Sequence, residues 1–193
     1  TTASYQPKNE ETTYLNEFYY TLDEIKNNFY DALIITGAPV ETLPFEEVAY
    51  WKELVNILEW SDKHVFQRVG ICWGAQALLY HQFKIPKYSL ENKIFGIFSH
   101  QINQAKLRLM QGFTDNFPMP VSRHTETKIS DIKEYLQFDI LAYSERAGIG
   151  MIINNNNDDF FIFNHLEYDF DTLHKEYQRD LKISQKILMP ENY

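Results

Sequence analysis

Cys72 is the only cysteine among 193 residues, and it lies in the stretch VGICWGAQALLY at residues 69–80. An apolar, strand-like run precedes it and small residues follow it, so the pattern predicts a tight turn between a strand and a helix. A side chain at such a turn is presented at the carboxyl edge of a sheet, where the helix amino terminus favours a thiolate. The pattern therefore predicts a nucleophilic cysteine; the alternative is a small buried apolar residue, which most free cysteines are.

A cysteine nucleophile needs an adjacent base, and His165 is the best of the six histidines for this role. It directly follows the apolar run FFIFN, and Glu167 comes two residues later, so a carboxylate can orient the imidazole and stabilise its charged form. A lone histidine is more often structural than catalytic, and we interpret the others in this way, although the polar loop around His124 is also a candidate for approaching a substrate. No His/Cys cluster has the spacing of metal ligands, so we expect no metal site.

Alternating patterns indicate the elements that position these residues. Short apolar runs predict buried strands at 30–39 and 64–71, and an Asn/Asp cluster between two apolar runs predicts a hairpin within 151–164. Spacings of three and four predict helices at 44–60, with Pro44 near its start, at 73–83, and at 171–184, with Asp169 or Asp171 as N-cap. We therefore expect an α/β fold: three layers, with a mostly parallel sheet, helices on both faces and the site at the carboxyl ends of the strands.

Composition limits the function classes. The chain length predicts one domain over residues 1–193. A net charge of -9 without a basic cluster argues against nucleic acid as a partner. No apolar run approaches the roughly 20 residues of a membrane helix. A single cysteine excludes an intramolecular disulfide, and the polar start "TTASYQPKNE" does not resemble a signal peptide, so we expect a cytoplasmic protein without a membrane partner.

The residues quoted above resemble a class I glutamine amidotransferase domain, with its cysteine after a strand and its His-x-Glu near the end. The sequence resembles one family more closely, the homoserine O-acyltransferases (homoserine O-acetyltransferases and trans-succinylases) of methionine biosynthesis. The match runs from about Tyr5 to Tyr193, and the motifs that carry it are ITGAPVETLPFEEVAYW, ICWGAQALLY, KIPKY, SRHTE and HLEYDFDTLHKEYQRD. The resemblance implies a flavodoxin-like, amidotransferase-like fold. It also implies that family members carry further amino-terminal and carboxyl-terminal segments, so this chain is expected to be a partial domain.

The resemblance also implies a two-step acyl transfer. The Cys72 thiolate takes an acyl group from acyl-coenzyme A, and the hydroxyl of an amino acid, deprotonated by His165, then attacks the acyl-enzyme. The Trp73 N–H and an N–H from the Gly37–Ala38 turn are candidates for the oxyanion hole that both steps need. The co-substrate is acetyl-CoA and no bound cofactor is expected.

Further roles carry over from the family. Glu41 falls where a glutamate goes with acetyl-CoA and a glycine with succinyl-CoA, and a carboxylate there would repel a succinyl carboxylate. Arg179 matches the arginine that holds the amino-acid carboxylate, and Lys93 and Ser122 match further substrate contacts. Without the family, each would be interpreted as a solvated polar residue. The resemblance therefore implies acetyl-CoA and a small amino acid as partners, and we expect a homodimer.

The chain departs from the family pattern near the acceptor. Asn164-His165-Leu166-Glu167 replaces Gly-His-Pro-Glu, and Val121 stands where a histidine usually precedes the serine. L-Homoserine is the expected acceptor, and L-serine, or succinyl-CoA as donor, is the alternative. Two other classes stay open: a truncated, non-catalytic binding relative and a glutamine amidase or cysteine hydrolase.

Overall fold

The computed structural model describes residues 17–103, 108–183 and 187–193. Strands and helices alternate over most of this range, as the sequence predicts. In chain order the elements, with η for a 3₁₀ helix, are α2 (Leu22–Ile25), β1 (Tyr30–Ile35), η1 (Phe45–Glu47), α3 (Trp51–His64), β2 (Val65–Ile71), α4 (Trp73–Phe83), β3 (Tyr88–Ile102), η2 (Arg108–Met110), β4 (Asn116–Glu126), α5 (Ile129–Lys133), β5 (Phe138–Ser144), β6 (Gly148–Asn154), β7 (Phe160–Ile162) and α6 (Thr172–Ile183).

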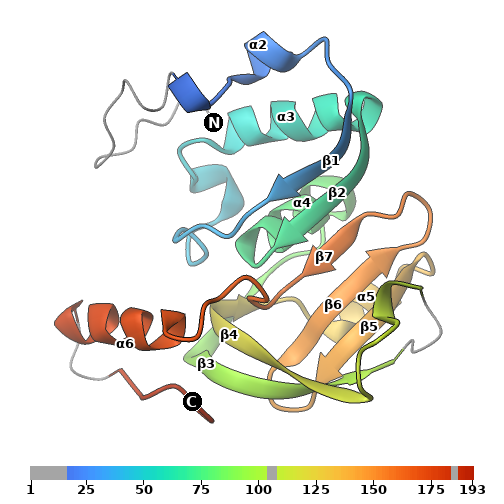
Figure 1. Cartoon of the computed structure of the whole chain (residues 1–193). Helices are drawn as coiled ribbons and strands as arrows, with labels where there is room; N and C mark the ends of the chain where they lie inside the picture. Colours follow the sequence, from blue (N-terminus) through green and yellow to red (C-terminus); the bar gives the residue numbers. More distant parts are fainter. Residues whose placement is uncertain (1–16, 104–107, 184–186) are drawn as a thin grey trace.

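The described strands form one sheet in the order β1-β2-β7-β6-β5-β3-β4 (Figure 1). Only β1–β2 and β2–β7 are parallel pairs, and the pairs from β7 to β4 are antiparallel. The α/β class and the single sheet with flanking helices are confirmed, but the prediction of a mostly parallel sheet is wrong for the described strands. For the pairs β5–β6 and β6–β7 the reason is the length of the connections: residues 145–147 and 155–159 are too short to cross over, and short links join antiparallel neighbours.

Helix α3 begins later than the sequence predicts. Pro44 starts the short η1 instead, and Val48 then takes an extended backbone conformation that interrupts the helical path. The Val48 side chain is buried in the core, which explains why the chain turns inward there before α3 begins at Trp51. From that point the predicted spacing holds, and Trp51, Leu54 and Leu58 form the buried face.

Two main hydrophobic clusters hold the sheet, and a third, minor cluster lies around Phe98, Val121 and Ala147. The larger one is contributed by α3, α4, α5 and the strands they cover, with Leu58, Leu78 and Phe161 fully buried. The smaller one is built from strands and η2, and includes Met119 and Leu141. Within the described ranges, no helix is long and apolar enough to cross a membrane.

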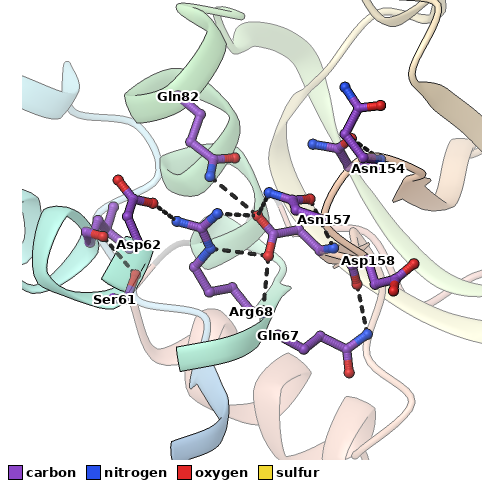
Figure 2. Close-up of polar contacts among 11 residues, drawn as sticks. Ser61, Asp62, Gln67, Arg68, Gln82, Asn154, Asn157 and Asp158 are labelled. Carbon is purple, nitrogen blue, oxygen red and sulfur yellow. Dashed lines mark hydrogen bonds and ion pairs between the residues drawn. The ribbon is translucent and has the colours of Figure 1, made fainter. Parts of the chain in front are cut away.

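A buried ion pair joins β2 to the turn between β6 and β7. Arg68 donates through its backbone N–H and its Nε to Oδ1 of Asp159, each at 3.0 Å, and its guanidinium also contacts Asp62 (Figure 2). Gln82 and Asn157 donate to the other oxygen of Asp159. Because β2 and β7 carry Cys72 and His165 just beyond their carboxyl ends, this ion pair helps to align the two strands that position the site.

Candidate active site

Cys72 lies at a strained turn between β2 and α4. Its backbone has φ 51° and ψ -119°, a conformation that costs energy for a residue with a Cβ atom. Its N–H donates to the carbonyl of Ile162 in the neighbouring β7 at 2.7 Å, which fixes the turn against the sheet. A strained residue persists only where the surrounding structure holds it in place, and such residues cluster at functional sites.

Two glycines beside Cys72 are required by close packing. A Cβ atom at Gly74 would lie 2.2 Å from the carbonyl oxygen of Ile35, and one at Gly70 would lie 2.5 Å from the Cα of Ala75. Neither distance is possible for real atoms, so only glycine allows α4 to start this close to the sheet. The small residues around Cys72 are therefore explained by the turn itself.

His165 and Glu167 lie in the loop that follows β7. His165 Nδ1 is 2.7 Å from Glu167 Oε1, and the His165 backbone N–H donates to the Pro120 carbonyl at 2.9 Å. Because a carboxylate only accepts, Nδ1 carries the proton and Nε2 is the nitrogen left for Cys72. The ring of Tyr168 stacks on the imidazole with the centroids 4.2 Å apart. The structure therefore brings Cys72, His165 and Glu167 together.

The protonation of His165 follows from these contacts. Burial alone would lower its pKa, but the hydrogen bonds to Cys72 and Glu167 outweigh burial and raise the pKa of His165 to about 10. Burial acts against the charged form of Glu167 as well, yet the contact with His165 holds the pKa of that carboxyl below its usual value. At neutral pH, His165 therefore carries a proton and faces Cys72 as an imidazolium.

The proposed oxyanion donors lie beside the thiol. Trp73 is the first residue of α4, so its N–H has no acceptor within the helix. A Cβ atom built on Gly37 would lie 3.3 Å from Cβ of Cys72 and 3.8 Å from Cε1 of His165. The backbone after β1 thus approaches both catalytic candidates, and Ala38 follows in the same wall.

These residues open into a cavity of about 720 Å³. Its wall near the thiol comes from the loop after β1, and its far wall comes from α6, β3 and β4. Every predicted site residue except Trp73 lines this cavity: Ala38, Glu41, Cys72, Lys93, Ser122, His165, Glu167 and Arg179. His124 lines it as well. Residues far apart in the sequence therefore share one chamber of a size suited to small ligands.

The far wall carries a charged network that the sequence did not reveal. Glu176 accepts hydrogen bonds from Ser122 and from the Tyr168 hydroxyl, each at 2.6 Å. Asp180 accepts from Lys93 at 2.9 Å and contacts Arg179 at 2.8 Å. The only sequence signal for this network was the spacing of Glu176, Arg179 and Asp180, which places the three side chains on one side of α6. The same spacing is equally typical of a solvated helix face.

A second missed network lies beneath His165. Asn164 is fully buried; its Nδ2 lies 2.9 Å from His100 Nε2, and its Oδ1 accepts from Arg123 at 3.4 Å. His100 Nδ1 must donate to the Phe98 carbonyl at 2.8 Å, so Nε2 is the acceptor and the Asn164 amide has one orientation. Burial lowers the pKa of His100 to about 4, which agrees with this neutral form. Asn164 therefore anchors the loop that carries His165 to β3 and β4.

Within the described ranges, no group of three or more His, Cys, Asp or Glu side chains is arranged to hold a metal ion. The described residues of the cavity wall supply several groups that can take part in chemistry. These are a thiol, a charged imidazole, backbone N–H donors and side chains with both signs of charge.

Comparison with known proteins identifies the fold. A glutamine amidotransferase from Thermotoga maritima superposes with a TM-score of 0.60 at 13% identity, over 80% of this chain and 66% of that one. The glutaminase domain of CTPS from Trypanosoma brucei gives a TM-score of 0.57 at 9% identity, over 88% of this chain and 76% of that one. These similarities confirm the glutamine amidotransferase-like fold and, at such identities, nothing further.

Sequence relatives identify the family. Proteins named homoserine O-acetyltransferase from Clostridium beijerinckii, Clostridium acetobutylicum and Bacillus cereus are 48%, 46% and 47% identical to this chain. The matches cover 100%, 100% and 98% of this chain but only 63%, 64% and 63% of the three relatives, so the chain spans less than two thirds of their length. The family model for homoserine O-succinyltransferase matches residues 1–193. On these matches, the chain belongs to the homoserine O-succinyltransferase family.

Proposed function

We propose that this chain transfers an acetyl group from acetyl-CoA to the side-chain hydroxyl of L-homoserine through an acetyl-Cys72 intermediate, in methionine biosynthesis. The observation that carries the proposal is the strained Cys72, hydrogen-bonded to the His165–Glu167 pair and facing a cavity whose far wall holds Arg179. The names of the relatives support acetyl transfer to homoserine.

In the first half-reaction, Sγ of Cys72 attacks the thioester carbonyl carbon of acetyl-CoA. The carbonyl oxygen becomes an oxyanion, which the N–H groups of Trp73 and Ala38 stabilise. The bond from that carbon to the coenzyme A sulfur then breaks, and the departing thiolate takes the proton of His165. The raised pKa of His165 supports this step, because it keeps that proton in place at neutral pH.

In the second half-reaction, the neutral His165 accepts the proton of the acceptor hydroxyl while its oxygen attacks the thioester of acetyl-Cys72. The tetrahedral intermediate collapses, the bond to Sγ breaks, and O-acetylhomoserine leaves. His165 keeps the proton, so the starting pair of imidazolium and thiolate is restored. Glu167 accepts from Nδ1 throughout and stabilises the imidazolium that forms.

The two ends of the cavity suit the two substrates. Glu41 lines the wall that also contains Gly37 and Ala38, where its carboxylate would repel an acyl group that carries a second carboxylate. At the far wall, the Arg179 side chain is 61% exposed and would bind an amino-acid carboxylate beside its existing contact with Asp180. Lys93 and Ser122 complete the acceptor subsite of this proposal.

No cofactor is needed for this chemistry, and acetyl-CoA enters as a co-substrate. We further propose that the protein is a cytoplasmic homodimer with small-molecule substrates and without nucleic-acid or membrane partners. The single cysteine and the acidic net charge support the compartment and the exclusion of nucleic acid. Light scattering of the purified chain tests the dimer.

The decisive experiment is to incubate the chain with acetyl-CoA alone and to measure its intact mass. We expect a gain of one acetyl group that is absent in the variant Cys72→Ala, and loss of the adduct when L-homoserine is added. Faster loss with L-serine would instead assign serine as the acceptor, and loss in water alone would indicate a hydrolase. No adduct on a folded chain would contradict the enzymatic proposal and favour a non-catalytic binding relative.

A further inference from the structure

The loop that carries Glu41 has few internal contacts of its own. Residues 39–43 lie in the connection between β1 and η1, and the backbone hydrogen bonds of this turn are Val40 N–H to the Ala38 carbonyl at 2.8 Å and Leu43 N–H to the Val40 carbonyl at 3.1 Å. A short turn of this kind needs further contacts to hold one conformation, because each ordered residue loses conformational entropy.

Lys87 supplies such a contact from outside the cavity. It lies in the connection between α4 and β3, 46 residues after Glu41 in the sequence. Its ammonium donates to the backbone carbonyl of Glu41 and, at 2.6 Å, to that of Leu43. The same ammonium lies 4.9 Å from the ring centroid of Phe45 in η1. Lys87 therefore binds the loop and the element that follows it at three points.

Glu41 is therefore held both at its side-chain carboxylate and at its backbone carbonyl. Its carboxylate oxygen Oε2 accepts a hydrogen bond from the backbone N–H of His124 in β4 at 3.0 Å, and its carbonyl is held by Lys87. Lys87 is half-buried, and burial lowers its pKa, while the Glu41 carboxylate opposes this shift. Charge-assisted hydrogen bonds to two carbonyls are stronger than neutral ones, so losing them would free the loop.

We propose that Lys87 is a positioning residue for acyl-group selection: by binding the backbone of the 39–43 loop, it keeps the Glu41 carboxylate in the cavity wall. The inference rests on the function proposed above and names the residue that maintains the specificity for the acyl donor. A carboxylate excludes an anionic acyl group only while it stays in the path of that group. When the loop is free, Glu41 can turn toward water and the repulsion weakens.

The direction in which the preference for acetyl-CoA over succinyl-CoA changes separates a positioning role of Lys87 from a simple effect of its charge. Lys87 is a cation near the acyl end, so its charge attracts an anionic acyl chain. If charge alone mattered, neutralising Lys87 would make the site more hostile to succinyl-CoA. If Lys87 acts by holding Glu41, its neutralisation makes the site more tolerant of succinyl-CoA. The two explanations therefore predict opposite changes in one measured ratio.

The test compares kcat/KM for acetyl-CoA with kcat/KM for succinyl-CoA in Lys87→Gln, Lys87→Arg and the control Lys133→Gln, which neutralises an exposed lysine on α5. We expect the acetyl-to-succinyl ratio to fall about tenfold in Lys87→Gln, the factor that corresponds to about 1.4 kcal/mol. Lys87→Arg should restore most of the ratio, and Lys133→Gln should leave it unchanged. KM for the amino-acid acceptor should stay within about twofold of wild type, because the far wall is untouched.

A double variant and a measurement without turnover complete the test. In a Glu41→Gly background, Lys87→Gln should not change the ratio further, because the carboxylate that Lys87 positions is gone. Hydrogen exchange of the amides of residues 40–43 should quicken in Lys87→Gln and stay unchanged in Lys133→Gln.

A ratio that stays constant or rises in Lys87→Gln, or an unchanged amide exchange, would overturn the role of Lys87 while leaving the proposed function intact. Absence of acetyl transfer by the wild-type chain would overturn the proposed function instead. The exchange measurement would then still show whether Lys87 holds the loop.

Discussion

Replacing Glu167 by Gln should slow the second half-reaction more than the first. The variant keeps an oxygen that can accept from Nδ1 of His165 but removes the negative charge 2.7 Å away. In the resting protein two contacts oppose the effect of burial on His165, one from Cys72 and one from Glu167. After acylation Cys72 is an uncharged thioester, so Glu167 becomes the main group that stabilises a forming imidazolium.

The magnitude follows from the geometry. Charges roughly 4 Å apart attract by about 4 kcal/mol at an effective dielectric constant of about 20. The Glu167 side chain is 49% exposed, so solvent screening reduces this to about 1–2 kcal/mol. Transfer to the acceptor should therefore slow about 5- to 30-fold. Acylation should slow only about two- to threefold, because a less basic His165 is also a better acid toward the departing coenzyme A thiolate.

The assay measures the two half-reactions separately by intact mass. Mixing with acetyl-CoA gives the rate of acetyl-Cys72 formation, and later addition of homoserine gives the rate of its loss. Glu134→Gln, which neutralises an exposed carboxylate beside α5, is the matched control. An NMR titration should also show the pKa of His165 lowered in Glu167→Gln. Equal losses in both half-reactions, or an unchanged titration of His165, would refute this assignment of Glu167.

Three further results are expected. Arg179→Ala should raise KM for the amino acid at least about tenfold while acetyl-Cys72 forms at the wild-type rate, and a loss of acylation would contradict its role at the acceptor end. Asp159→Asn should lower the free energy of unfolding in urea by about 3 kcal/mol because it removes the buried charge partner of Arg68 and leaves only the half-exposed Asp62, whereas the exposed neighbour variant Asp158→Asn should change it little. Burial lowers the pKa of His100 to about 4, so between pH 6.5 and pH 4 the unfolded chain binds a proton at this residue and the folded chain does not. The free energy of unfolding should therefore fall by about 3 kcal/mol as the pH falls from above 6.5 toward 4. His100→Gln should remove this pH dependence, measured by denaturation curves at several pH values.

Local signals in the sequence were enough to place Cys72 and His165 at strand ends. The apolar run before Cys72 and the small residues after it required a tight turn, and β2 and α4 do meet there. His165 follows β7 closely, so its backbone could only lie near the same edge of the sheet. These features depend on a few neighbouring residues, and such patterns are the part of a fold that a sequence expresses directly.

Features that depend on distant partners were not visible. Glu176 and Asp180 resemble solvated charges on α6, and only the docking of that helix against β3 and β4 gives them Lys93 and Ser122 as partners. The mixed sheet was missed for a similar reason, because the sequence pattern of a buried strand does not specify the direction of its neighbour. The sequence showed Asn164 only as a departure from a family glycine, whereas its amide is fully buried and contacts His100.

The approach of Cys72 to His165 depends on the register of two strands that share only three residue pairs. Val69, Gly70 and Ile71 of β2 face residues 160–162 of β7. A slip of one residue would move the histidine by about 3.3 Å and turn alternate side chains to the other face. Polar contacts fix the register at both ends of this short ladder: Arg68 N–H to the Asp159 carboxylate before it, and Cys72 N–H to the Ile162 carbonyl after it. The ion pair far from the cavity and the strained turn inside it therefore serve one geometric purpose, which is to hold the thiol within reach of the imidazole.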